Sequence, residues 1–158
     1  MAEKLDAIDY KMLLLLQQDG RITNLELSNR VGLSPAPTLE RVKKLERARI
    51  IEGYHARVNR QKMQLGISVF IQVTLSRQVD NVINKFKQRI AEVAEIVECY
   101  QITGNADFML RIVVSDMPAF EKLISEKLSK MDEIGSMHSS VIISEVKQSK
   151  VLPLRYER

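Results

Sequence analysis

The sequence has one cysteine, no tryptophan and no long apolar run. Cys99 has no second cysteine to pair with, so an internal disulfide is impossible, and its neighbours Val97 and Ile102 predict a buried strand thiol. The longest apolar run, Met12 to Leu16, is far too short to cross a bilayer, and the N-terminus has no apolar stretch of signal-peptide length. We therefore expect a cytoplasmic protein with no membrane partner.

Glycines and histidines are also few. The six glycines fall at junctions between patterned segments and form no phosphate-binding cluster. His55 and His138 are far apart and lack the close-spaced Cys, His or carboxylate partners of a metal site. No nucleophile has an obvious base. These absences argue against catalysis, so we expect no enzyme, no metal and no resident cofactor.

The 158 residues are 45% hydrophobic and 28% charged, the balance of a folded globular chain of one or two small domains. The net charge is +4, and it is not spread evenly. Residues 34–60 hold seven Lys or Arg against three Glu, a surplus of four that equals the net charge of the whole chain. A local basic excess of this kind favours contact with nucleic acid.

A helix-turn-helix is predicted over residues 23–45, and its second helix lies at the start of this basic region. Thr23 and Glu26 have the spacing of a capping box, which marks the start of the first helix. Gly32 allows the backbone to reverse. Ser34 is a candidate N-cap for the second helix, and the two prolines that follow fall in the first turn, where their missing amide hydrogens cost nothing.

The second helix has the character of a DNA recognition helix. Leu39, Val42 and Leu45 recur at helical spacing and predict its inner face. We expect Thr38 and Arg41 to point outward and read bases, while the later basic residues touch phosphate. The full set of predicted DNA contacts is Ser34, Ala36, Pro37, Thr38, Arg41, Lys43, Lys44 and Arg47. The alternative is a small helical bundle whose basic face meets only water.

The flanking segments complete a DNA-binding head. Apolar residues keep helical spacing from Leu5 to Leu16, which predicts a first helix that packs across the other two. Residues 53–59 alternate weakly like a strand, and residues 60–65 resemble a connector that ends at Gly66. We place a domain boundary there.

After Gly66 the pattern changes to alternation, which is typical of a half-buried strand. The order that follows is strand, helix, strand, strand, helix, strand, and the two halves repeat at one constant offset. This is the split repeat of a ferredoxin-like βαββαβ fold, so the fold class is α+β. The predicted strands span 67–75, 96–103, 108–114 and 137–146, and the predicted helices centre on 82–90 and 120–128.

Such a domain places both helices on one face of the sheet. The other face then needs cover, and the residues predicted to lie on it are Phe70, Tyr100, Met109 and Val113. A dimer formed sheet to sheet would bury them.

Five short runs stand out along the chain: residues 5–9 (LDAID), residues 32–42 (GLSPAPTLERV), residues 52–54 (EGY), residues 104–108 (GNADF) and residues 145–147 (EVK). These runs resemble the Lrp/AsnC transcription regulators, and they occur in the order found in that family. The resemblance implies a winged-type helix-turn-helix domain over 1–52, a strand and linker over 53–65, and a ferredoxin-like effector and oligomerisation domain, the RAM domain, over 66–158. It further implies binding to double-stranded DNA, self-association into dimers and then into tetramers or octamers, and small amino-acid effectors bound between dimers.

The family's effector pocket involves a Gly-x-x-Asp turn. Here Asp107 or Asn105 would hold the ammonium of an amino acid, and backbone amides near Gly104 or Gly135 would receive its carboxylate. The alternative is a plain hairpin turn with Asp107 as its hydrogen-bonding anchor. The small residues at 105 and 106 favour a longer ligand such as leucine or methionine. The predicted effector residues are Gly104, Asn105, Ala106, Asp107, Gly135, Ser136, Ser139 and Ser140.

We therefore expect a sequence-specific DNA-binding regulator of amino-acid metabolism genes, modulated by a small amino acid. Two alternatives remain. One is a constitutive architectural protein that wraps DNA without a metabolite, and the other is a metabolic enzyme or free-standing sensor on a ferredoxin-like fold.

Overall fold

The computed structural model describes residues 4–149 and 151–156, which fall into two compact units. The first contains the described residues up to Arg57 together with those from Lys147 onward, and the second is Val58–Val146. The C-terminal residues from Lys147 thus group with the N-terminal head, whereas the sequence placed all of 66–158 in the effector domain. Gln17 of the head explains the grouping, because its side chain accepts from the Leu152 amide at 2.6 Å and donates to the Leu152 carbonyl at 3.4 Å.

The head consists of the three predicted helices, α1 (Ala7–Gln18), α2 (Asn24–Val31) and α3 (Pro35–Arg47). Their core is formed by Met12, Leu27 and Val31, which are buried and lie at the apolar positions of the sequence pattern. Thr23 caps α2 as predicted, since its hydroxyl accepts from the Glu26 amide at 3.1 Å. The return bond that would complete the predicted capping box is not formed, and the Glu26 carboxylate pairs with Arg30 instead. A complete capping box occurs at the start of α1, between Asp6 and Asp9.

The predicted strand at residues 53–59 is not formed. This segment contains neither helix nor strand, and Tyr54 and Val58 are exposed along it. A strand requires a neighbour for its backbone hydrogen bonds, and the structure pairs this segment with none of its four strands.

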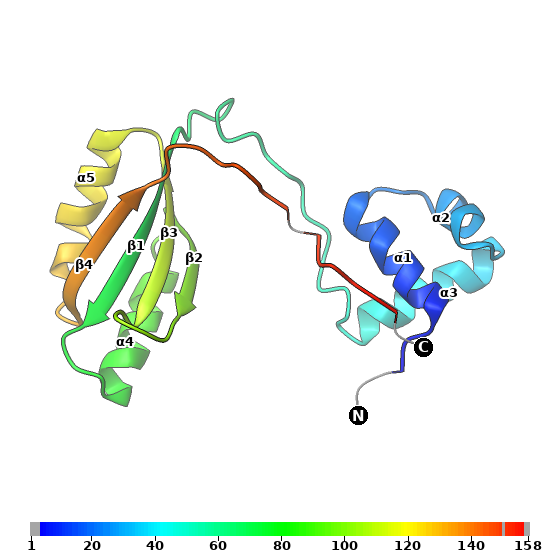
Figure 1. The fold of residues 1–158 in the computed structure, drawn as a ribbon, viewed down its shortest axis with the longest axis horizontal. Coiled ribbons are helices and arrows are strands. Elements are labelled where there is room, and N and C mark those ends of the chain that lie inside the picture. Colours follow the sequence, from blue (N-terminus) through cyan, green and yellow to red (C-terminus); the bar gives the residue numbers. More distant parts are fainter. Residues whose placement is uncertain (1–3, 150, 157–158) are drawn as a thin grey trace. The chain divides into compact units, whose positions relative to one another are not determined.

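The second unit is a four-stranded antiparallel sheet in the order β2-β3-β1-β4, with α4 and α5 covering one face (Figure 1). The predicted βαββαβ order is confirmed. The last strand was predicted to begin at 137 and end at 146, but it begins and ends earlier. The elements are β1 (Ile67–Leu75), α4 (Asp80–Ala91), β2 (Ile96–Gln101), β3 (Phe108–Val114), α5 (Met117–Glu126), the short 3-10 helix η1 (Leu128–Lys130) and β4 (Ile134–Val141).

Strand alternation decides which side chains meet the helices. Val69, Ile71 and Val73 of β1 are fully buried in the core beneath α4 and α5. The residues between them face the opposite side, which we call the open face. By register, Phe70 lies opposite Arg111, and Tyr100 lies opposite Met109. Phe70 and Tyr100 are exposed, as expected for a face that awaits cover, but Val113 on the same face is already buried.

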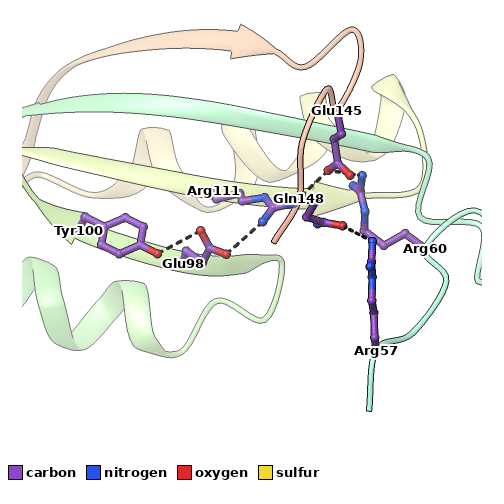
Figure 2. Close-up of polar contacts among 7 residues, drawn as sticks. All are labelled: Arg57, Arg60, Glu98, Tyr100, Arg111, Glu145 and Gln148. Atoms are coloured by element: carbon purple, nitrogen blue, oxygen red, sulfur yellow. Dashed lines mark hydrogen bonds and ion pairs between the residues drawn. The ribbon is translucent and has the colours of Figure 1, made fainter. Parts of the chain in front are cut away.

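A charged network crosses the open face (Figure 2). Arg111 donates to Glu98 at 3.0 Å and to Glu145 at 3.2 Å, and Glu145 also accepts from Arg60 at 2.7 Å. Arg60 precedes β1 and Glu145 follows β4, so the network ties together the segments by which the chain enters and leaves this unit. Within the first unit, Arg57 donates to Gln148 at 2.8 Å.

Cys99 is exposed on β2, so the prediction of a buried thiol is wrong. Strand β2 is an edge strand with only one neighbour, and this leaves the outer side of its residues uncovered. Partial desolvation nevertheless raises the pKa of the Cys99 thiol, against a smaller opposite effect of Lys87, and this keeps the unreactive protonated form in place.

Candidate functional site

The first candidate site is the start of helix α3. Ser34 is its N-cap, and Ser34, Ala36 and Pro37 are all exposed, as a surface that approaches DNA requires. The Asn24 side chain donates to the Pro35 carbonyl at 2.8 Å, which ties the start of α3 to the start of α2. Asn24 was not singled out from the sequence, because an asparagine at the start of a helix usually serves as a local cap.

The predicted outward placement of Thr38 is wrong. Its side chain is fully buried, and its hydroxyl donates to the Ser34 carbonyl one turn earlier at 2.9 Å. That local hydrogen bond removes the cost of burying a hydroxyl, so threonine can occupy the inner face. Leu39 correspondingly lies 42% exposed instead of inside. Thr38 therefore does not reach DNA bases in this structure.

Arg41 is held by two carboxylates of the head itself, and its side chain is 32% exposed. One guanidinium nitrogen lies 2.7 Å from a carboxylate oxygen of Asp6 and 2.7 Å from one of Asp9. The hydrogen bond to Asp9 is the main cause of a raised pKa for Arg41, followed by the bond to Asp6. The Asp9 amide and then Arg41 lower the pKa of Asp6 against partial desolvation. The predicted base-reading arginine is thus a link between α3 and the start of α1.

The basic residues of the second half of α3 do lie on the surface. Lys43, Lys44 and Arg47 are all exposed. Lys43 forms an ion pair with Glu40 one turn earlier at 3.2 Å, an exposed contact that a phosphate can displace at little cost. The surface of α3 therefore combines small uncharged side chains at its start with cations near its end.

The second candidate site lies where β1 ends and β3 and β4 begin. Asp107 is the centre of this end of the sheet. Its two carboxylate oxygens accept from the Leu75 amide at 2.8 Å and from the Gln78 side chain at 2.7 Å, and its amide donates to the Val73 carbonyl at 2.9 Å. Asp107 therefore anchors the turn before β3 to the end of β1, which matches the alternative reading of this residue.

The rest of the Gly-x-x-Asp turn surrounds that anchor. Gly104 has φ +114°, a backbone angle that a side chain would strain. Ala106 is buried, whereas Asn105 is exposed and its carbonyl accepts from the Thr74 hydroxyl at 3.4 Å. The turn thus presents Asn105 beside the open face.

The start of β4 approaches the same point. A side chain at Gly135 would lie 3.1 Å from the Leu75 carbonyl oxygen and from Ser76, so only glycine fits there without a shift. Ser136 is exposed and pairs with Thr74, on the face that also carries the Asn105 contact. The structure therefore brings six of the predicted effector residues together around the end of β1.

Ser139 and Ser140 are not part of that group. Ser139 pairs with Ile71 and so shares the helix-covered side of the sheet, while Ser140 pairs with Phe70 further along the open face. A contribution from either residue would come at an interface with a second copy, and it stays a prediction.

Glu133 was missed from the sequence. Its carboxylate is buried, with ion pairs to Lys85 at 2.6 Å and Arg89 at 2.9 Å, both from α4. The hydrogen bond from Lys85 is the main cause of a lowered pKa for Glu133, which outweighs desolvation. The sequence did contain one signal for this residue, the internal repeat, because Glu133 in the second half matches Glu95 in the first half.

Residues 4–149 and 151–156 contain no group of three His, Cys, Asp or Glu side chains placed to hold a metal ion. No helix there is long and apolar enough to span a membrane.

Comparison with known proteins agrees with one candidate site in each of the two units. Residues 5–52 match the family described as winged helix-turn-helix DNA-binding, and residues 68–152 match the Lrp/AsnC ligand binding domain. At 42% identity over 151 residues, the chain is similar to the leucine-responsive regulatory protein of Escherichia coli strain K12, with 96% of this chain and 92% of that protein covered.

Solved structures give the same result. A transcriptional regulator of Neisseria meningitidis in complex with L-Met has a TM-score of 0.91 and 35% identity, over 95% of this chain and 97% of the other. An AsnC family regulator from Agrobacterium tumefaciens has a TM-score of 0.89 and 28% identity, over 94% and 97%.

A helix-turn-helix head followed by a ferredoxin-like ligand-binding domain defines a class of DNA-binding transcriptional regulators, not of enzymes. Within that class, the chain belongs to the Lrp/AsnC family.

Proposed function

We propose that this regulator responds to a small apolar amino acid, with methionine and leucine as the first candidates, and controls genes of amino-acid metabolism. The observation that carries the proposal is the convergence of Gly104–Asp107 and Gly135–Ser136 on the end of β1, within a domain that matches a ligand-binding family. A regulator that binds chromosomal DNA works in the cytoplasm, and we place it there.

The proposed DNA contacts follow the exposed surface of α3. Ser34, Ala36 and Pro37 at the start of the helix are the candidates for base edges, because side chains at the start of a recognition helix enter the major groove. Lys43, Lys44 and Arg47 are the candidates for phosphate. Arg41 acts indirectly, by fixing α3 against α1.

The proposed ligand contacts follow from what Asp107 already does. Both of its carboxylate oxygens accept internal hydrogen bonds, so its main role is to hold the turn. Asn105 and Ser136 are both exposed and both adjoin Thr74, and their side chains would bind the charged end of an amino acid. Its apolar side chain would need cover from a second subunit, as would Ser139 and Ser140 if they contribute.

We further propose that the protein self-associates through the open face. Phe70 and Tyr100 are exposed there, and a sheet-to-sheet contact would bury both. A dimer would carry two heads, and hence would bind half-sites about one helical turn, or a multiple of it, apart. Assembly beyond the dimer, into tetramers or octamers, would bring the effector turns of different dimers together.

Light scattering with and without L-methionine or L-leucine, combined with gel shifts on DNA selected from a random library, tests the proposal. We expect a multimer whose mass changes when the amino acid is added, or whose DNA affinity changes by roughly 5- to 150-fold, the usual range of allosteric coupling. A multimer that binds DNA and ignores all twenty amino acids would favour the constitutive architectural protein. A monomer would contradict the two-headed arrangement.

A further inference from the structure

Two equivalent ion pairs connect the two halves of the ferredoxin-like unit. Arg89 at the end of α4 binds Glu133 in the second half at 2.9 Å, and Lys127, which follows α5, binds Glu95 in the first half at 2.7 Å. Arg89 and Lys127 occupy matching positions of the sequence repeat, as do Glu95 and Glu133. Each helix end is thus fastened to the turn that precedes a strand of the other half.

The main chain of each glutamate also makes a hydrogen bond outside its own turn. The carbonyl of Glu133 accepts from the Ser76 amide at 2.8 Å, and the carbonyl of Glu95 accepts from the Val113 amide at 2.9 Å. Glu95 and Glu133 therefore each fix their turn twice. The side chain binds a residue at the end of a helix, and the main-chain carbonyl accepts from a residue in or next to a neighbouring strand. The two turns lie at opposite ends of β3. The Glu95 turn is bonded to Val113, near the end of β3, whereas the Glu133 turn is bonded to Ser76, whose neighbour Leu75 contacts Asp107 just before β3 begins.

Only the Glu133 turn adjoins the candidate effector residues. Ser76, which Glu133 holds, follows Leu75, which Asp107 holds. The Ser76 hydroxyl also donates to the Asp132 carbonyl at 3.0 Å, and the close approach of Gly135 to Leu75 and Ser76 completes the junction. Residues 75–76 are thus clamped from one side by Asp107 and from the other by Glu133.

The two glutamates also differ in environment. The Glu133 side chain is 3% exposed and has a second cation, Lys85, at 2.6 Å, whereas the Glu95 side chain is 33% exposed. The position that matches Lys85 in the second half is Leu123, a buried core residue. The symmetry is therefore broken at one place, and the stronger cation cluster lies at the end that carries the effector residues.

We propose that Arg89 and Glu133 are positioning residues of the amino-acid site. The Arg89–Glu133 pair sets the distance between the β4 turn, which bears Gly135 and Ser136, and the β3 turn, which bears Asn105. Ligand affinity then depends on α4, although no residue of α4 belongs to the candidate site. This inference rests on the proposed function, since it concerns the same site.

The test uses two matched variants of the full chain. Arg89→Met removes the guanidinium and keeps a long apolar stem, and Lys127→Met does the same at the equivalent position. Both are expected to fold, since Arg89 is 33% and Lys127 45% exposed and Glu133 keeps Lys85 as a partner. L-methionine affinity is measured by calorimetry, and amide hydrogen exchange at Ser76 and Val113 by NMR.

We expect Arg89→Met to speed exchange at Ser76 and to weaken L-methionine binding about tenfold, as for other residues that couple to a site without touching the ligand. Lys127→Met should speed exchange at Val113 and leave L-methionine affinity unchanged. DNA affinity without the amino acid should stay the same in both. Glu133→Gln, which keeps the side-chain volume, should weaken L-methionine binding as Arg89→Met does, and it replaces that variant if Arg89→Met does not fold.

Two results would overturn the inference while leaving the proposed function intact. One is L-methionine binding by Arg89→Met as tight as by the unmodified chain. The other is an equal loss in Lys127→Met, which would show a general effect of loosening the domain. If the unmodified chain binds neither L-methionine nor L-leucine, the proposed function fails first, and the inference fails with it.

Discussion

Arg41 of α3 and Asp9 of α1 form an ion pair in which guanidinium nitrogen and carboxylate oxygen are 2.7 Å apart. The Asp9 side chain is 5% exposed, so Arg41 is the partner that makes its burial tolerable. An arginine on a recognition helix is usually interpreted as a DNA contact, and here it fixes the helix that carries the proposed contacts.

Replacement of Arg41 by Met is therefore expected to destabilise the head. Asp9 would lose a charged hydrogen bond, at a cost of about 1–3 kcal/mol in the free energy of unfolding. Urea denaturation followed by circular dichroism measures the loss. DNA affinity should fall for all sequences alike, since the geometry of α3 is disturbed as a whole. A normal unfolding midpoint combined with relaxed preference at one base pair would show instead that Arg41 reads a base.

Lys43 provides the contrasting case. It is exposed and its ion pair with Glu40 is a surface contact, so Lys43→Met should leave the unfolding midpoint unchanged. Loss of one phosphate contact should weaken binding about equally across DNA sequences and reduce the slope of log affinity against log salt by about 1. Gel shifts at several salt concentrations test this. An unchanged slope would remove Lys43 from the DNA surface, and Glu40→Gln serves as the control for loss of the ion pair alone.

The contrast between these residues shows how far the sequence alone could predict the structure. Regular periodicity identified all three helices of the head and the βαββαβ order, because apolar spacing directly encodes which side of an element is buried. It failed where a polar residue is buried with a local partner. Thr38 was placed outside and Leu39 inside, and the hydrogen bond from Thr38 to the Ser34 carbonyl reverses that choice.

Contacts between residues far apart in sequence were harder still. Asp107 could be assigned to its turn, but its bonds to Leu75 and Gln78 depend on how β1 lies beside β3. Nothing in the pattern of residues 147–156 signals the contact of Leu152 with Gln17, because a single pair of hydrogen bonds leaves no periodicity. Glu133 was missed because its two cations, Lys85 and Arg89, come from α4, which is distant in sequence from the turn that holds Glu133.

Glu133 gives a prediction about pH. Its folded-state pKa lies below the usual 4.5, so its ion pairs contribute stability that is fully present above about pH 4.5 and is lost as the pH falls through the lowered value. The difference in urea midpoint between the unmodified chain and Glu133→Gln should be largest at neutral pH and shrink in acid. A difference that does not change between neutral and acid pH would mean that the Glu133 charge does not stabilise the fold.

The C-terminal segment gives the last prediction. Gln17 makes two hydrogen bonds to the backbone of Leu152, and the rings of Tyr10 and Tyr156 lie 5.5 Å apart, so the chain end covers part of α1. Gln17→Ala should release this segment and lower the stability of the head by about 1 kcal/mol. Hydrogen exchange at the Leu152 amide should rise at the same time.

Gln18→Ala is the matched control, because Gln18 is the exposed neighbour on the same helix and the two substitutions change helix propensity equally. The comparison separates a bound chain end from one that only lies nearby. If the two variants unfold at the same urea concentration, and exchange at Leu152 is fast in both and in the unmodified chain, the segment is not part of the head in solution. If only Gln17→Ala is weakened, the DNA-binding head includes the end of the chain, and the effector unit is joined to it by two connections instead of one, since the chain enters that unit at Val58 and leaves it at Val146.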